Sequence, residues 1–136
     1  MRIVLDTNVL VSALLSPASF PARILAWVLS GDVALCVDAR ILAEYENVLS
    51  RPEFGFNPAH IRDLLDFIHR EAIPTPALAS PALSPDPADM VFIEVCLGGA
   101  ARRIVTGTLK HFPSAVQEVV TVMSPKEFVT TFLKNL

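Results

Sequence analysis

The chain has 136 residues, 52% of them hydrophobic, and a formal net charge of −3 at pH 7. This length suffices for a buried core, and we expect a single domain over residues 1–136. The longest apolar run, residues 9–15, is much shorter than the ~18 residues of a membrane span. The first residues also lack the pattern of a signal peptide, so we expect a cytoplasmic protein without a membrane segment. The acidic balance does not indicate nucleic-acid binding, but a carboxylate cluster neutralised by metal ions would leave it open.

The apolar composition exceeds the usual needs of a soluble core, which favours a buried interface and hence a homodimer. The two cysteines, Cys36 and Cys96, lie in apolar stretches at a spacing that fits no zinc motif. We interpret them as buried, inert thiols.

The first predicted strand covers residues 3–5, three branched or long aliphatic side chains that are typical of a strand buried on both faces. Asp6, Thr7 and Asn8 follow at its carboxyl end. Ligands bind at this end of the strands in open α/β sheets. Asp6 is also a favourable N-cap for the next helix, so the pattern alone supports capping and function equally.

The rest of the chain alternates between helix and strand signals, which we take in order. Expected helices cover residues 9–15, 20–30, 39–50, 58–71, 87–97 and 125–133, and expected strands cover residues 33–37, 72–75, 103–106 and 119–122. The proline-rich residues 74–87 show no apolar periodicity and predict a stiff, extended connector. Ser124 and Glu127 form a capping box at the last helix.

One acid in the helix at residues 39–50 stands out. Glu44 lies in line with the apolar Ile41 and Val48, which draws it toward the buried face, whereas Glu46 has no such neighbours and is expected in solvent. A carboxylate at the edge of a buried stripe is unfavourable unless it is paired or metal-bound.

The second half of the chain offers further candidates. Asp86 precedes Pro87 and is interpreted as a helix cap, while Asp89, in the first helical turn, fits either capping or a ligand site. The turn after the strand at 103–106 contains candidates for phosphate binding, namely Thr106, Thr108, Lys110 and His111, although the last two equally fit a solvated turn. Arg102 and Arg103 are candidates for nonspecific RNA binding.

Short, apolar strands alternating with helices predict an α/β fold, with three layers (α/β/α) around a central parallel sheet of four or five strands. In the order 3-2-1-4-5, strands one and four are neighbours at the switch point. Asp6 then faces the turn at residues 106–108, and Glu44 and Asp89 can point into the same crevice.

Three segments, residues 3–10, 41–52 and 86–107, resemble the PIN-domain family, and in particular its toxin-like ribonucleases from toxin–antitoxin systems. The resemblance implies a PIN-like fold and a metal-dependent endoribonuclease that hydrolyses RNA with Mg²⁺ or Mn²⁺. It also implies an antitoxin protein as a possible partner. By the same resemblance Asp6, Glu44 and Asp89 are the catalytic, metal-binding acids, and Asn8 supports them.

The sequence departs from this family at Thr108, where a fourth acid is common, and we expect a weaker second metal site there. Asp86 and Thr108 remain possible additional metal contacts. A clustered set of carboxylates repels itself, and hard cations with oxygen ligands relieve that repulsion.

Three functions other than RNA cleavage are also compatible with an α/β fold. A phosphatase with Asp6 as nucleophile would need an acid at position 8, which is Asn8, and a phospho-receiver domain would need an acidic pair after the first strand. The main alternative is a PIN-like RNA- or protein-binding module whose catalysis has weakened, and Thr108 is the feature that favours it.

Overall fold

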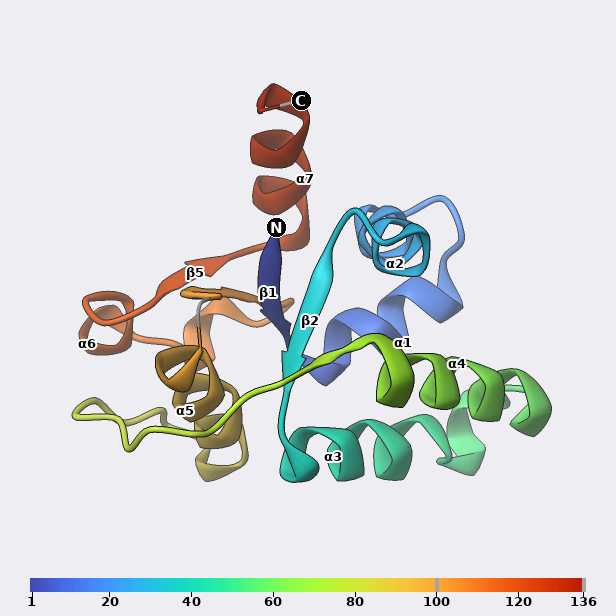
Figure 1. Cartoon of the computed structure of the whole chain (residues 1–136), viewed down its shortest axis with the longest axis horizontal. Coiled ribbons are helices and arrows are strands. Elements are labelled where there is room, and N and C mark those ends of the chain that lie inside the picture. The colour runs from blue at the N-terminus through green and yellow to red at the C-terminus, as the bar shows by residue number, and fades with distance from the viewer. Residues whose placement is uncertain (100, 136) are drawn as a thin grey trace.

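The computed structural model describes residues 1–99 and 101–135. Strands and helices alternate along the chain as predicted (Figure 1). The strands are β1 (Arg2–Leu5), β2 (Ala34–Val37), β3 (Ile73–Pro74), β4 (Arg103–Val105) and β5 (Thr121–Met123). The α-helices are α1 (Thr7–Leu15), α2 (Phe20–Ser30), α3 (Ala39–Leu49), α4 (Pro58–Glu71), α5 (Met90–Gly98), α6 (Ser114–Gln117) and α7 (Pro125–Lys134). Three short 3₁₀ turns among the described residues are η1 (Pro52–Phe54), η2 (Pro87–Asp89) and η3 (Leu109–His111).

The strands form one parallel sheet in the order β3-β2-β1-β4-β5, which confirms the predicted order. In the register of the central pairs, Val4 lies opposite Ile104 and Ile3 lies opposite Leu35. The three aliphatic residues of β1 are at most 1% exposed, because strands on both sides and helices on both faces cover them. The carboxyl ends of β1 and β4 therefore lie side by side, where the strand order reverses.

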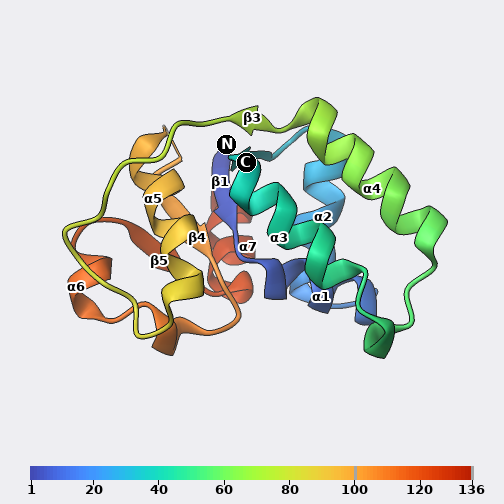
Figure 2. The same cartoon turned by 90° about the horizontal axis from the view of Figure 1, so that it is seen from below.

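Helices cover both faces of this sheet, as an α/β/α fold requires. Helix α5 contacts β1, β2 and β4 on one face, while α2 packs against α1 and α7 on the other (Figure 2). Helix α3 lies below the carboxyl ends of β1 and β2 in Figure 1 and contacts α1, α4 and α5. An ion pair between Arg40 of α3 and Glu94 of α5, 2.8 Å long, joins the two helices.

The helix ends follow the sequence signals. Ser19, Asn57 and Ser124 each accept a hydrogen bond from a backbone N–H in the first turn of their helix, and Ser124 and Glu127 form the predicted capping box. Gly31 ends α2 with a φ of 89°, a left-handed conformation that glycine adopts without strain.

The last strand is displaced from the predicted residues 119–122 to Thr121–Met123. The reason is helix α6, which the sequence pattern did not predict. The backbone N–H groups of Val119 and Val120 both donate to the carbonyl of Val116, at 3.0 and 3.1 Å, so these two valines complete the end of α6. Their β propensity is overridden by this local helical turn.

The proline-rich connector is tied to α5 by backbone contacts. The N–H of Leu78 donates to the carbonyl of Glu94 at 2.9 Å. A Cβ on Gly98 would collide with the carbonyl oxygen of Pro76. Gly98, the last residue of α5, thus provides the space for the connector to pass.

In the described ranges, 1–99 and 101–135, no single helix is long and apolar enough to cross a membrane. Helices α1 and α2 meet the length and composition requirement only as a pair, and they are bent by 103° relative to each other.

Candidate metal centre

Asp6 lies at the carboxyl end of β1, at the switch point of the sheet. Its backbone N–H donates to the carbonyl of Val105 in β4 at 3.0 Å, and the residue is 5% exposed. Its Oδ1 accepts a long hydrogen bond of 3.4 Å from the N–H of Asn8, as an N-cap does. Asp6 therefore caps α1 and at the same time presents a carboxylate at the ligand-binding end of the sheet.

A chain of hydrogen bonds from the turn after β4 holds this carboxylate. The hydroxyl of Thr106 donates to Asp6 Oδ2 at 2.8 Å, which uses its only hydrogen. The hydroxyl oxygens of Thr106 and Thr108 are 3.3 Å apart. Because the hydrogen of Thr106 is already used, the hydroxyl of Thr108 donates to Thr106. The same Thr108 oxygen accepts a hydrogen bond from the side-chain amide of Asn8 at 3.0 Å. The amide oxygen of Asn8 in turn accepts from the N–H of Gly107 at 3.1 Å. The four side chains thus fix one another.

Three of the expected site residues, Thr106, Asn8 and Thr108, belong to this network. Thr106 is fully buried beneath Asp6, so its hydroxyl positions a carboxylate and is turned away from bulk solvent. Asn8 and Thr108 are half-buried beside it. The predicted supporting role of Asn8 has a structural basis, because its amide joins α1 to the turn after β4.

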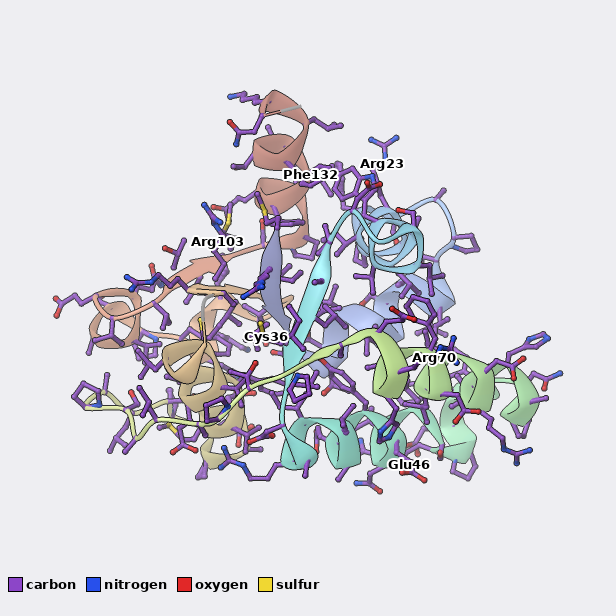
Figure 3. All side chains as sticks on the ribbon, viewed as in Figure 1. Arg23, Cys36, Glu46, Arg70, Arg103 and Phe132 are labelled. Atoms are coloured by element: carbon purple, nitrogen blue, oxygen red, sulfur yellow. The ribbon has the colours of Figure 1, made fainter. Side chains whose placement is uncertain are left out.

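Glu44 reaches the same place from α3. It is half-buried and lines a cleft of about 350 Å³ together with Asp6, Asn8 and other residues. The next residue, Tyr45, is fully buried, and its hydroxyl donates to the carbonyl of Leu5 at 2.6 Å. This bond fixes the helix against the end of β1. Glu46 lies on the outer side of α3 and is exposed, as predicted (Figure 3).

Asp89 comes from the turn η2 at the start of α5. It is 7% exposed, although Asp86, which caps this turn by accepting from the N–H of Ala88 at 3.0 Å, is half-buried. His111 Nδ1 lies 3.0 Å from Asp89 Oδ2, within ion-pair distance. One side-chain ligand atom from each of Asp86, Asp89 and His111 lies within 4.8 Å of the others.

The acids influence one another electrostatically. Burial raises the pKa of Asp6 above its usual 3.8; the hydrogen bonds from Thr106 and Asn8 oppose this increase, and the charge of Glu44 adds to it. Burial also raises the pKa of Asp89 to about 6, the charge of Asp6 adds to this effect, and His111 opposes it. Burial and mutual repulsion thus make it unfavourable for Asp6 and Asp89 to be ionised together unless a cation compensates their charges.

The position of His111 is the feature that sequence reasoning did not foresee. Its predicted roles were phosphate binding or a solvated turn, and the half-buried ring instead faces Asp89. The hydroxyl of Ser84, in the proline-rich connector, donates to the carbonyl of His111 at 2.6 Å. Only the proline content of that connector was informative, and it indicated stiffness without indicating this contact.

The predicted cationic residues are distributed differently. Lys110 is exposed in η3, next to His111. Arg102 and Arg103 lie at the amino end of β4, and the side chain of Arg103 points away from the carboxyl end of the sheet (Figure 3). The structure therefore places Asp6 and Glu44 in one cleft and groups Asp89 with Asp86 and His111, close enough to Asp6 for the two charges to interact. The two arginines lie at the other end of β4.

The donor atoms fit a hard divalent cation. Among the residues that the structure describes, two buried side-chain oxygens have no hydrogen-bond partner, Thr7 Oγ1 and Asp89 Oδ2, and both belong to this end of the sheet. A buried carboxylate oxygen without a hydrogen bond is costly, and a cation reduces that cost. Oxygen-rich sites of this kind suit Mg²⁺ and Mn²⁺.

Comparison with known proteins agrees with this geometry. A family model described as "PIN domain" matches residues 2–110, which include every acid of the cluster and the turn after β4. No sequence among the curated proteins matches the chain.

Proposed function

Starting from the premise that this chain belongs to the PIN-domain family, whose members are generally metal-dependent nucleases, we propose that it is an endoribonuclease that hydrolyses RNA phosphodiester bonds with Mg²⁺ or Mn²⁺. The observation that carries this proposal is the convergence of Asp6, Glu44 and Asp89 on the switch point of the sheet. In the proposed site these three carboxylates hold the cation, and Asp86 and Thr108 are available at its edges.

The bound cation would supply Lewis-acid chemistry, lowering the pKa of a water and stabilising charge on the phosphodiester. The chain itself orients the ligands. Thr106 holds Asp6 Oδ2 in place, Tyr45 fixes α3 against β1, and the Asn8–Thr108 contact keeps the turn closed. Hydrogen bonds to ligating carboxylates fix their orientation, and they affect metal affinity as well as geometry.

His111 has a separate part in this proposal. Its Nδ1 lies 3.0 Å from Asp89 Oδ2, at the edge of the acid cluster, so the ring and the cation approach the same oxygen. Asp89 must be ionised to bind the cation. Because the pKa of Asp89 is raised to about 6, we expect activity to increase as the pH rises through that value.

The test is cleavage of a mixed-sequence single-stranded RNA with Mn²⁺, Mg²⁺ or EDTA. We expect wild type to cleave with either metal, and Asp6→Asn, Glu44→Gln and Asp89→Asn to lose cleavage while retaining the fold. Glu46→Gln is the matched control, because it removes an acid from the exposed side of the same helix. Cleavage by all three site variants at the rate of the control would refute the proposed ligand set.

The finer biological role is also a proposal. We infer that the protein acts in the cytoplasm as the toxin of a toxin–antitoxin pair and forms a homodimer, as its resemblance to toxin-like ribonucleases suggests. The apolar composition of the chain and its exposed leucines, such as Leu15, Leu29 and Leu133, support the homodimer. Growth arrest on expression, relieved by a neighbouring open reading frame, would support the toxin role, and sedimentation equilibrium would measure the oligomeric state.

A second candidate is a PIN-like RNA- or protein-binding module with weakened catalysis, which Thr108 favours because it contributes no charge. Thr108→Asp distinguishes the two functions. In a nuclease with an incomplete ligand set, the added carboxylate should increase metal affinity and cleavage. In a binding module, wild type should bind RNA tightly without cleaving it.

A further inference from the structure

The cleft that contains Asp6 and Glu44 has a second wall made of residues that are not acidic. Arg51 and Phe54, from the segment that follows α3, line the same cleft as the carboxylates of Asp6 and Glu44. Arg51 also lines a neighbouring pocket of about 400 Å³ between α3 and α4, in which Phe56 takes part. The two hollows therefore share Arg51 as a lining residue.

The backbone of the segment presents two aromatic rings together. Pro52–Phe54 form the turn η1, and Gly55 follows with a φ of 64°, a conformation that favours glycine. The rings of Phe54 and Phe56 stack with centroids 5.5 Å apart and planes inclined by 17°. Phe56 packs against the hydrophobic core, so it supports Phe54, which lies farther out at the cleft.

Arg51 is an exposed cation with no internal role in the described residues. The ion pairs found there join Arg40 with Asp38 and Glu94, Arg70 with Glu71, and His111 with Asp89, and Arg51 takes part in none of them. The one cation–π contact among the described residues instead joins Arg70 and Phe67.

We propose that Arg51 and Phe54 bind the nucleotide adjacent to the scissile phosphate, with the guanidinium on its phosphate and the Phe54 ring stacked on its base. This inference rests on the proposed nuclease function and names the form of its substrate, an unpaired strand. Base–aromatic stacking requires a base that is free of its complement, and it is tolerant of sequence. Arginine complements phosphate oxygens with paired N–H donors.

The test measures binding apart from cleavage. Fluorescence anisotropy follows a labelled 12-nucleotide single-stranded RNA in Ca²⁺, and a gel run afterwards verifies that the RNA is intact. The variants are Arg51→Gln, Phe54→Leu and Phe54→Trp. The controls, Arg23→Gln and Phe132→Leu, make the same chemical changes on α2 and α7, at the opposite end of the strands (Figure 3).

We expect Arg51→Gln and Phe54→Leu each to weaken binding about tenfold, and Phe54→Trp to restore wild-type affinity, because stacking depends on the aromatic face. Wild type should bind an RNA duplex more weakly than the single strand. For the duplex, wild type and Phe54→Leu should have equal affinity. The salt dependence of binding should decrease for Arg51→Gln and not for Phe54→Leu.

The outcomes separate this inference from the proposed function. If wild type cleaves RNA with Mn²⁺ but Arg51→Gln and Phe54→Leu bind like the two controls, the nucleotide contact is refuted and the nuclease stands. Equal loss of affinity for single-stranded and duplex RNA in Phe54→Leu would also refute base stacking. If wild type neither binds nor cleaves RNA, both proposals fail together.

Discussion

Replacing Asp89 by asparagine should stabilise the metal-free protein above pH 7, although it removes a proposed ligand. The pKa of Asp89 is raised from 3.8 to about 6, first by burial and then by the charge of Asp6. Between these two values the folded state holds a proton that the unfolded state has released, so stability falls as the pH rises. Below pH 4 both states are protonated and the effect disappears.

The size of the effect follows from the shift. Each pKa unit corresponds to about 1.4 kcal/mol, so the full shift is equivalent to ~3 kcal/mol. The nearby His111 and the polar surroundings of Asp89 reduce this value, and an asparagine leaves a polar amide in the same place. We therefore expect Asp89→Asn to raise the free energy of unfolding in EDTA at pH 8 by about 1–2 kcal/mol.

The assay is urea unfolding in EDTA from pH 4 to pH 8, followed by the fluorescence of Trp27. This is the single tryptophan of the chain, and it packs on Phe132 with ring centroids 4.2 Å apart. Asp66→Asn, on the exposed side of α4, is the control for the loss of one negative charge. Added Mn²⁺ should stabilise wild type and leave Asp89→Asn nearly unchanged.

The reasoning would be refuted by either of two results. One is an Asp89→Asn variant that is less stable than wild type at pH 8 in EDTA. The other is a stability difference between the two proteins that stays constant from pH 4 to pH 8. Either result would mean that burial of the ionised carboxylate does not oppose folding.

Three further substitutions test contacts in the site and in the fold that supports it. Thr106→Val removes the hydroxyl that donates to Asp6, so we expect Mn²⁺ affinity, measured by calorimetry, to fall about 10- to 100-fold; unchanged affinity would contradict the positioning role. Stability should fall by about 1–3 kcal/mol, because the N–H of Thr108 also loses its acceptor. Gly98→Ala should destabilise the fold by ~1–3 kcal/mol in urea unfolding, because its Cβ meets the carbonyl of Pro76. Tyr45→Phe leaves the carbonyl at the end of β1 without its 2.6 Å partner, and we expect a loss of about 1–2 kcal/mol in the same assay.

The sequence by itself determined most of the elements and two features of the site. Capping residues such as Ser19, Asn57 and Ser124 place helix starts because their side chains bond to backbone groups two or three residues away. Continuous apolar runs identify buried strands by the same short-range logic. Glu44 was found because its helical neighbours are apolar, and Asp6 because it directly follows a buried strand.

Only the tertiary structure decided how these residues meet. The hydroxyl of Thr106 donates to Asp6, which is 100 positions away in the sequence. His111, in the turn η3 after β4, lies against Asp89, in the turn η2 before α5. No local pattern encodes such contacts, because they depend on the register of β1 with β4 and on the path of the connector held by Ser84. The sequence therefore specified the carboxylates, whereas the folded backbone specified their partners and the burial that raises the pKa values of Asp6 and Asp89.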